Sequence, residues 1–487
     1  MTSDETPISS RRAFLRAAGV TALAAFAGCN EDTQQVSRTE TASGTTRLPT
    51  ATESPTTESP TTESASPTTA ESDLPQIAEQ YETAVDITET AVDGNGDTPI
   101  EPALSELVAD DMLVYFPPGR YRMDGHWEHV DFSRLALVGE DATIVPPQGY
   151  AGYMFILGRR GGDASATGLR FEGFTFDYSA RQTGPRALHF HVADGLQVRD
   201  VRIDGVSDTN ENATRFGVTD PDGSGEVRRL QLPNGSTGHR AVGCLVPRDN
   251  RGTLTFRDCR IEGFLNNGLY ASPSTGQVNV FGGAYVNNDI SNVRVSGPAH
   301  VRNVYSLTDT NSSEPLNMRG VRLRNAADIV VENCRVQLLN APHADGALVV
   351  ESDVDVATIR NTAIQVEADG LYAIRIKTGQ DDRDGGVSHF RFEDVQVTGS
   401  ASGGSAVGIV DRRDVLFRNL EITQPGANRN GLNVVRSSGI RLRDSVINVT
   451  ETPIVRRNST VQTTNTQLSS TATPVQRTET RDRSNRS

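Results

Sequence analysis

The side chains best suited to chemistry are arginines, histidines and carboxylates in the middle of a 487-residue chain. Several arginines alternate with apolar residues, as in the segment from Val321 to Arg324. Residues that alternate in this way point to opposite faces of a strand, so the charged members share one face. Guanidinium groups bind carboxylates through two parallel hydrogen bonds, and lysine binds them as a point charge. The pattern therefore predicts a surface that recognises an anionic ligand.

This alternation predicts a row of outward basic and aromatic side chains, opposite inward residues such as Leu269 and Ile374. The residues of the row that we expect to bind substrate are His189, His191, Tyr270, Arg294, Arg322, Arg324 and Glu351. An alternative is that the arginines pair with nearby acids such as Asp345 or Asp381 and form a salt-tolerant surface network. The choice between these interpretations depends on where the acids lie.

Two reactions of an acidic polysaccharide fit the candidate groups. The candidate catalytic residues are Asp289, His343, Asp345, Arg375 and Lys377. Inverting hydrolysis needs a carboxylic acid and a carboxylate about 6.5–9.5 Å apart, and Asp289 with Asp345 or Glu351 is a possible pair. β-Elimination needs a base and neutralisation of the substrate carboxylate, which the histidine and the two cations of this set could provide. The sequence leaves open whether the protein cleaves its ligand or only binds it.

A repeated eight-residue phrase must position these side chains. It reads apolar, any, apolar, any, Asn or Asp, apolar or small, any, apolar. The clearest copies begin at Leu196, Leu254, Ile329, Phe390, Val415 and Ile440. With degenerate copies included, successive starts lie between 21 and 34 residues apart, except for one gap of 58. That gap has room for one extra coil and a loop.

The fifth position of the phrase must contain a bend, because an apolar residue follows it directly and resets the alternation. Two copies carry glycine there, Gly173 and Gly282, and both Asn and Asp also tolerate the left-handed backbone of a sharp bend. The other nine copies carry Asp200, Asp258, Asn303, Asn333, Asn361, Asp394, Asn419, Asp444 and Asn465. Short strands joined by such bends predict eleven or twelve parallel coils stacked along an axis.

The predicted coils resemble the right-handed parallel β-helix of the pectin-lyase-like superfamily over residues 80–470. Before the repeats, a glycine-rich turn at 93–97, an amphipathic run at 99–109 and the strand Tyr115-Phe-Pro-Pro-Gly-Arg-Tyr121 are similar to the entry cap of many such proteins. The expected fold class is therefore all-β, a right-handed parallel β-helix with a short N-terminal capping helix. The expected boundaries are 79–134 for the cap and 135–470 for the β-helix.

A weaker resemblance concerns the site. The stretch Arg375-Ile-Lys377-Thr, followed by Gly-Val-Ser at 386–388, resembles a segment of polygalacturonase-type glycoside hydrolases whose Arg and Lys hold the substrate's carboxylate. Lys377 is the only lysine in the chain. Asp289, after two asparagines, could stand for the Asp of that family's Asn-Thr-Asp motif, and His343 for the His of its Gly-His-Gly motif. The family's paired aspartates have no counterpart.

The N-terminus resembles a twin-arginine export signal, with Arg11, Arg12, Phe14 and Leu15 in register before an apolar run. The signal is expected to span residues 1–28, and Ala-Gly-Cys at its end resembles a lipobox, so Cys29 is expected to be lipidated. A simply cleaved signal with an incidental cysteine is the alternative. Residues 29–78, rich in Thr, Ser, Pro and Glu, are expected to form a stalk. We therefore expect an extracellular cell-surface protein, lipid-anchored to the outer face of the cytoplasmic membrane.

The amino-acid composition limits the classes of binding partner that we expect. The net charge of −15 with a single lysine is typical of proteins that stay soluble at high salt, and no long basic run exists for nucleic acid. We expect an acidic polysaccharide as partner, no nucleic acid, membrane contact only through the lipid anchor, and a monomer. The tail at 471–487 is expected to be disordered. Possible glycosylation sequons begin at Asn212, Asn234, Asn311, Asn448 and Asn458.

No motif demands a cofactor, although calcium is possible. Residues Asp220 to Gly225 resemble the opening of a calcium loop, but Gln231 occupies the position where a bidentate Glu is expected. An acidic glycine turn is the simpler interpretation, and no metal site is assigned. Cys259 and Cys334 are expected to lie buried three coils apart, too far for a disulfide. Cys244 is expected to be buried as well.

Overall fold

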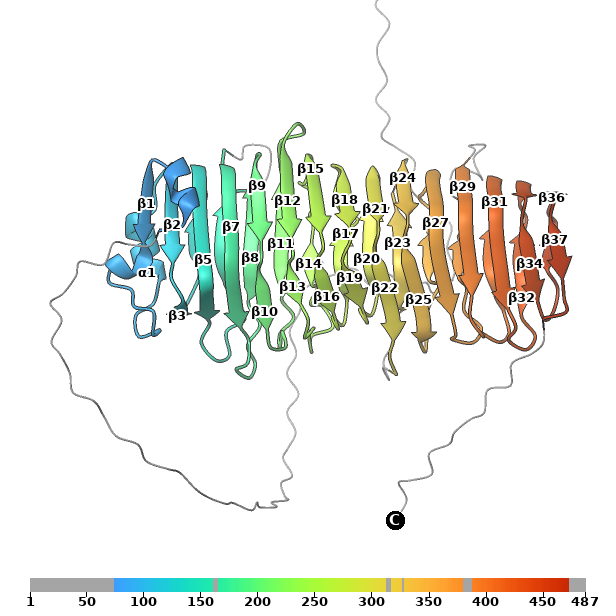
Figure 1. The fold of residues 1–487 in the computed structure, drawn as a ribbon, viewed down its shortest axis with the longest axis horizontal. Helices are drawn as coiled ribbons and strands as arrows, with labels where there is room; N and C mark the ends of the chain where they lie inside the picture. Colours follow the sequence, from blue (N-terminus) through green and yellow to red (C-terminus); the bar gives the residue numbers. More distant parts are fainter. Residues whose placement is uncertain (1–73, 161–164, 312–316, 326–327, 380–387, 473–487) are drawn as a thin grey trace, which may run out of the picture. The chain divides into compact units, whose positions relative to one another are not determined.

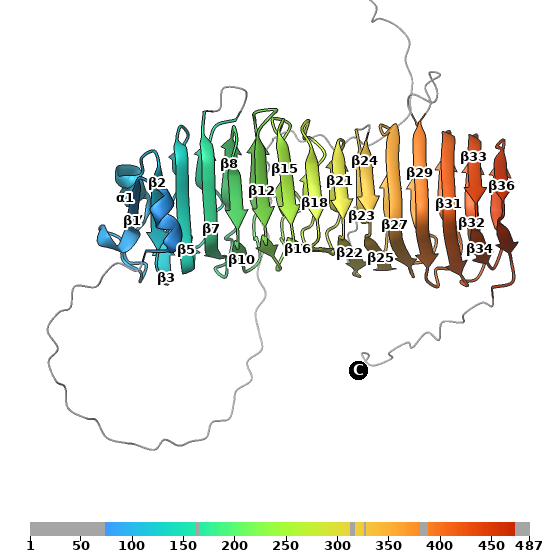
Figure 2. The ribbon, with the colours of Figure 1, turned by 45° about the horizontal axis from the view of Figure 1, so that its top comes forward.

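The computed structural model describes residues 74–160, 165–311, 317–325, 328–379 and 388–472. All described residues belong to one compact unit. Within that unit the strands pair in parallel, each with the strand one coil further along the chain. Figures 1 and 2 show the coils stacked in chain order from β1 to β37. The fold is a parallel β-helix, as predicted.

Two parallel sheets form the walls of the described coils, and the elements before them are η1 (Gln76–Gln80), η2 (Ile87–Glu89) and α1 (Glu101–Leu107). Sheet B has thirteen strands: β4 (Trp127–His129), β6 (Tyr153–Gly158), β8 (Arg186–Val192), β11 (Thr214–Val218), β14 (Cys244–Leu245), β17 (Asn267–Ala271), β20 (Ser291–Ser296), β23 (Arg319–Arg324), β26 (Leu348–Val350), β28 (Ile374–Ile376), β30 (Ser405–Val410), β32 (Asn430–Val435) and β35 (Ile454–Arg457).

Sheet A continues around the predicted bends and contains, among the described residues, β1 (Thr83–Asp86), β2 (Met112–Phe116), β3 (Gly119–Arg122), β5 (Ser133–Val145), β7 (Thr167–Asp177), β9 (Leu196–Arg199), β10 (Arg202–Asp204), β12 (Ser224–Arg228), β13 (Gln231–Leu232), β15 (Thr253–Arg257), β16 (Arg260–Glu262), β18 (Val278–Phe281), β19 (Ala284–Val286), β21 (Ala299–Arg302), β22 (Tyr305–Asp309), β24 (Ile329–Glu332), β25 (Arg335–Asn340), β27 (Val356–Val366), β29 (His389–Thr398), β31 (Arg413–Gln424), β33 (Ser438–Arg443), β34 (Val446–Val449), β36 (Val461–Thr464) and β37 (Gln467–Ser469).

The bends have the backbone conformation that the repeat phrase predicts. All nine Asn and Asp residues at its fifth position, and both glycines, have φ between 47° and 78°. The gap of 58 residues does contain an extra coil, formed by β12 and β13, and its bend is Arg229 with φ 53°. An arginine is disfavoured at positive φ, but Arg229 forms an ion pair with Asp200, the bend residue of the preceding coil. The phrase missed this coil because its bend residue is atypical.

The N-terminal cap differs in extent from the prediction. The helix α1 lies within the expected run 99–109, and Leu104 is fully buried in the main core. The expected cap also supplies a complete coil, because β2 and β3 pair with β5 and β4 pairs with β6. For this reason sheet B has thirteen strands over the described residues rather than eleven or twelve. Leu74 and Ile77, which belong to the expected stalk, pack against a small outer cluster around Tyr115.

The inside of the coils is a continuous apolar core. The residues predicted to face inward, among them Leu269, Val321 and Ile374, are fully buried. Cys244, Cys259 and Cys334 are buried free thiols, as expected, and burial raises the pKa of each. No helix in the described part of the chain is long and apolar enough to cross a membrane. The core therefore fixes which side chains of sheet B face outward.

Candidate functional site

Strand pairing aligns the outward residues of sheet B in one row, as predicted. One residue from each of twelve successive strands is paired with the next, from β6 to β35. We call this set the sheet B row: Ile156, His189, Arg215, Leu245, Tyr270, Arg294, Arg322, Val349, Arg375, Gly408, Asn433 and Val455. Residues that are distant in sequence, such as Arg294 and Arg322, thereby lie on neighbouring strands of one face through this stacking.

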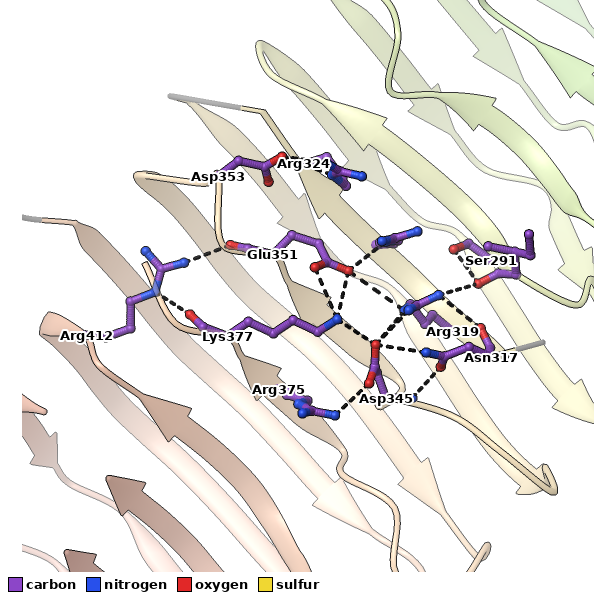
Figure 3. A network of polar contacts seen from close by, with 12 residues as sticks. Ser291, Asn317, Arg319, Arg324, Asp345, Glu351, Asp353, Arg375, Lys377 and Arg412 are labelled. Carbon is purple, nitrogen blue, oxygen red and sulfur yellow. Dashed lines mark hydrogen bonds and ion pairs between the residues drawn. The ribbon is translucent and has the colours of Figure 1, made fainter. Parts of the chain in front are cut away.

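Asp345 lies at the centre of a polar network on this face (Figure 3). Its carboxylate accepts hydrogen bonds from Arg319 Nη2 at 2.7 Å, Arg375 Nη1 at 2.6 Å and Lys377 Nζ at 2.6 Å. Asn317 donates to Oδ2 at 3.0 Å and accepts the backbone N–H of Asp345 at 2.7 Å. Three cations from β23 and the β28 segment thus converge on one carboxylate.

Glu351, directly after β26, forms a second centre in the same network. Its Oε1 accepts a hydrogen bond from Arg322 Nε at 2.7 Å, and Lys377 Nζ lies 3.2 Å from it. Lys377 is therefore shared between Asp345 and Glu351. Arg324 pairs separately with Asp353 at 2.8 Å. The alternative interpretation, in which the arginines pair with acids, is correct for Asp345, whereas Asp381 lies outside the described residues.

The network nevertheless keeps an excess of positive charge. Its described cations are Arg294, Arg319, Arg322, Arg324, Arg375 and Lys377, and its described acids are Asp345, Glu351 and Asp353. Six cations against three acids leave a local charge of +3, on a protein whose net charge is −15. Such a local reversal of sign attracts anionic ligands to this part of the surface.

The surrounding cations keep the carboxyl groups of Asp345 and Glu351 ionised. Burial alone would raise the pKa of Asp345, but the hydrogen bond from Lys377 and the charge of Arg319 lower it well below the usual range. Burial likewise acts to raise the pKa of Glu351, and the charges of Arg322 and Lys377 outweigh it. Neither carboxyl group is suited to donate a proton. Both are fixed anions that orient the cations around them.

Arg294 differs from the other cations because it stacks on an aromatic ring. Its guanidinium lies 4.3 Å from the centroid of Tyr270, its neighbour in the sheet B row. Its Nε is buried and has no hydrogen-bond partner. Burial lowers the pKa of Arg294 to about 10. A buried donor without an acceptor is costly.

Arg412 supports the network from beneath. Its side chain is almost fully buried and donates to the backbone carbonyls of Lys377 at 2.6 Å, Glu351 at 2.8 Å and Val354 at 3.0 Å. Figure 3 shows it bonded to the main chain of the two residues whose side chains meet on the outer face. It also packs on the ring of Phe390 at 5.0 Å. Arg412 therefore sets the spacing between the β26 and β28 segments.

The two histidines near the start of sheet B are less accessible than predicted. His189 is 9% exposed, its ring lies 5.2 Å from that of Tyr153, and burial lowers its pKa to about 2. His191 is fully buried, with Nδ1 3.4 Å from Asp249 Oδ2. Asp249 belongs to the segment after β14, which folds over His191. A direct contact between His191 and a ligand does not fit this burial, whereas His189 retains a small exposed edge.

Asp289 and His343 lie outside the network. Asp289, between β19 and β20, is 3% exposed, and its Oδ2 has no hydrogen-bond partner. Burial raises its pKa to about 6, although the charge of His239 acts in the opposite direction. Two strand steps separate its coil from that of Asp345, roughly 10 Å. His343 is exposed, and in the described hydrogen bonds only its backbone carbonyl takes part, accepting Met318 N–H at 2.9 Å.

Comparison with known proteins yields no family. No protein-family model matches the chain, and no curated protein sequence matches it. Among solved structures, the chain is similar to the A-module of mannuronan C-5 epimerase AlgE4 from Azotobacter vinelandii, with 14% identity and a TM-score of 0.43 over 64% of this chain and 95% of the other. It is also similar to the surface protein and adhesin PfbA of Streptococcus pneumoniae, with 11% identity and a TM-score of 0.44 over 80% and 99%.

A third similar structure is the catalytic unit of a GH87 α-1,3-glucanase from Streptomyces thermodiastaticus, with 13% identity and a TM-score of 0.35 over 79% of this chain and 69% of the other. An enzyme that modifies a polymer, an adhesin and a glucanase thus share this likeness. At these scores the likeness carries no inference about activity. The site must therefore be interpreted from its own geometry.

Arg319 is a site residue that alternation alone misses. Arg319 lies two residues before the buried Val321, so in a regular strand both side chains would face the core. A Cβ at Gly320 would lie 2.4 Å from the side chain of Val336, which shows that Gly320 faces the core and Arg319 faces outward. The glycine directly after Arg319 is the signal in the sequence that could have indicated this irregularity.

Sheet A carries a second outward row of arginines that the sequence analysis did not single out. They occupy the residue before seven of the twelve bends, as Arg199, Arg228, Arg257, Arg302, Arg360, Arg418 and Arg443. Acids interrupt or pair with this row: Glu332 stands within it and pairs with Arg360, and Glu226 pairs with Arg257 at 2.6 Å. Glu172 and Glu393 also stand in the row, so seven arginines face four acids and this row carries an excess of +3 as well.

The remaining predicted sites are surface features or lie beyond the described residues. Asn234, Asn311 and Asn458 are exposed, whereas Asn212 and Asn448 are half-buried. Asp220 uses a carboxylate oxygen to accept the N–H of Asp222 at 2.9 Å, as an acidic turn does. No group of three or more potential metal ligands occurs in the described part of the chain. Cys29 lies outside the described residues.

Proposed function

We propose that the protein binds an acidic, uronate-containing polysaccharide on the outer face of sheet B. The observation that carries this proposal is the local charge of +3 around Asp345 and Glu351 on an otherwise acidic protein. Arginine and lysine side chains aligned along one face suit a polymer that carries a carboxylate on each sugar.

The network also explains how such a ligand would be selected. Asp345 and Glu351 hold the cations in a fixed arrangement, so less side-chain entropy is lost on binding. They also compete with the ligand for the same donors. A neutral polysaccharide offers no carboxylate and would gain little from this surface. The proposal therefore predicts discrimination by ligand charge rather than by sugar identity.

The test is affinity electrophoresis of the full chain in gels containing polygalacturonate or a neutral glucan. Only the acidic polymer should retard the protein, and Lys377→Gln should reduce the retardation severalfold. Asp345→Asn should increase it, because three cations lose their internal acceptor. Equal retardation by both polymers, or no effect of either substitution in variants that keep the native circular dichroism spectrum, would contradict the proposal.

Hydrolysis is a second candidate function, favoured by the contrast between Asp289 and Asp345. Burial raises the pKa of Asp289 to about 6, whereas Asp345 is held ionised by cations. Carboxyl groups whose environments push their pKa values apart are candidates for acid and base. Their coils lie two strand steps apart, roughly 10 Å along the axis. Inverting hydrolysis would require the two carboxyl groups themselves to lie about 6.5–9.5 Å apart. Asp289 would then protonate the leaving oxygen.

Reducing ends and the absorbance of unsaturated products should be followed during incubation with uronans at high salt. New reducing ends that are lost in Asp289→Asn would support hydrolysis, and unsaturated products would instead indicate elimination. If neither product forms with calcium present or absent, the enzyme candidate fails while polysaccharide binding stands.

Export through a twin-arginine signal and lipidation at Cys29 belong to the same proposal. Signal cleavage that globomycin inhibits, or labelling of the protein with palmitate, would support the lipid anchor if it is lost in Cys29→Ala.

A further inference from the structure

The sheet B row contains four arginines. Arg322 pairs with Glu351 and is largely buried, and the other three stand at equal intervals. Strand pairing places three strand steps between Arg215 and Arg294, and three more between Arg294 and Arg375. Parallel strands lie about 4.8 Å apart, so each interval is about 14 Å. The spacing follows from the coil height alone, because all three residues belong to one register row.

Two of these arginines, Arg294 and Arg375, lie beside a tyrosine ring. Arg294 stacks on Tyr270 at 4.3 Å, and Arg375 lies 5.5 Å from the centroid of Tyr372. A Cβ on Gly408 would come within 2.7 Å of the Tyr372 ring, so this glycine lets the ring lie flat against the sheet. Arg215 follows His189 in the row, whose ring packs on Tyr153. A cation beside a flat ring matches a uronate, whose carboxylate and sugar face need both.

Two of the three arginines also have an unsatisfied donor. The Nε atoms of Arg215 and Arg294 are buried and have no hydrogen-bond partner among the residues that the structure describes. Burial lowers the pKa of each arginine to about 10, so both remain charged near neutral pH. Unpaired buried N–H groups of a charged side chain are costly unless an acceptor arrives. A ligand carboxylate bound by the outer nitrogens of the same guanidinium would help to offset this cost.

We propose that the sheet B row binds a single extended acidic glycan along the coil axis, with the carboxylates of every third sugar at Arg215, Arg294 and Arg375. This inference rests on the proposed function and adds the direction and minimum length of the ligand. A pyranose in an extended 1→4-linked chain advances by nearly the height of one coil, so polymer and protein repeat together. A chain of about seven sugars reaches all three arginines.

The resulting affinity should depend on ligand length in steps. A chain long enough for a second arginine binds it as an intramolecular event, which raises affinity without a new kind of contact. Oligogalacturonates of two to nine residues should be titrated calorimetrically into the full chain at one fixed salt concentration. We expect Kd to fall about tenfold or more between three and four sugars, and again between six and seven.

A matched pair of variants tests which face carries the ligand. Arg302 on sheet A resembles Arg294 closely, because it stacks on Phe281 at 4.6 Å and its Nε is also buried without a partner. Arg294→Gln should abolish the step at four sugars and weaken heptamer binding at least tenfold. Arg302→Gln should leave both steps unchanged. Equal effects of the two substitutions would overturn the assignment to sheet B.

The length series on the natural protein is informative even if a variant fails to fold. Affinity that reaches its limit at three sugars, or rises smoothly with length, would overturn the three-position track while leaving polysaccharide binding intact. Failure of both oligomers and polygalacturonate to bind would instead contradict the proposed function. The two failures are therefore distinguishable in one experiment.

Discussion

Asp289 and Asp345 show at the scale of single residues how neighbours decide the effect of burial. Both carboxyl groups are largely removed from water, which by itself raises a carboxyl pKa. Asp345 receives hydrogen bonds from three cations and stays ionised, whereas Asp289 has one oxygen without any partner. The same side chain thus becomes a fixed anion in one coil and a weak acid in another.

The raised pKa of Asp289 predicts a pH-dependent loss of stability. Its folded value of about 6 exceeds the ordinary value of 3.8, so its favourable contribution is complete below pH 3.8 and is lost as the pH rises through 6. Asparagine imitates the neutral acid at every pH. Between about pH 4 and pH 8, Asp289→Asn should therefore gain up to about 3 kcal/mol relative to the natural protein.

Guanidinium chloride unfolding at several pH values measures this difference. The exposed Asp222→Asn is a suitable control, because its carboxyl lies in a solvated turn and the substitution should have little pH-dependent effect. A stability difference between Asp289→Asn and the natural protein that stays constant across this range would show that Asp289 is not buried uncharged.

At the scale of elements, the bends were predictable because they depend on local backbone chemistry. Only Gly, Asn and Asp adopt the left-handed conformation readily, so the repeat phrase identified eleven bends from residue type alone. The bend at Arg229 was missed because its conformation depends on an ion pair with Asp200 from another coil. Local signals in the sequence cannot report a contact of that kind.

The same distinction explains what was predictable about the site. Alternation placed Arg294, Arg322 and Arg375 on one outward face, and strand pairing confirms that they share a row. The role of Arg319 depends on an irregularity at Gly320, and that of Arg412 on carbonyl groups in two other coils. The pairing of acids with cations likewise depends on the register between coils, which residue types do not specify.

The bend residues make a prediction about backbone strain. Asn361 has φ 47° and forms no hydrogen bond among those described, so its substitution tests conformation alone. Asn361→Ala should destabilise the fold by about 1–2 kcal/mol, because alanine resists the left-handed region. Asn361→Gly should cost much less. Thermal unfolding monitored by circular dichroism distinguishes the two, and equal losses would contradict the conformational explanation.

At the scale of the whole molecule, the net charge of −15 predicts that salt stabilises the protein. Like charges repel one another more in the compact state than in the extended chain, and salt screens this repulsion. The screening length falls from about 10 Å at 0.1 M to about 3 Å at 1 M. We expect the midpoint of urea unfolding to rise as KCl increases over this range. A falling midpoint would mean that the attractive surface pairs outweigh the overall repulsion.

The sheet B row has a consequence for how this molecule could change its preference for a ligand. Because one coil adds one fixed step, removing the coil that contains Val349 would shorten the interval between Arg294 and Arg375 by a third, with each neighbouring coil still intact. A polymer whose charges recur every third unit would then be out of phase with the protein. In such an architecture, the spacing of charges that the protein prefers in its ligand changes in fixed steps as coils are inserted or deleted.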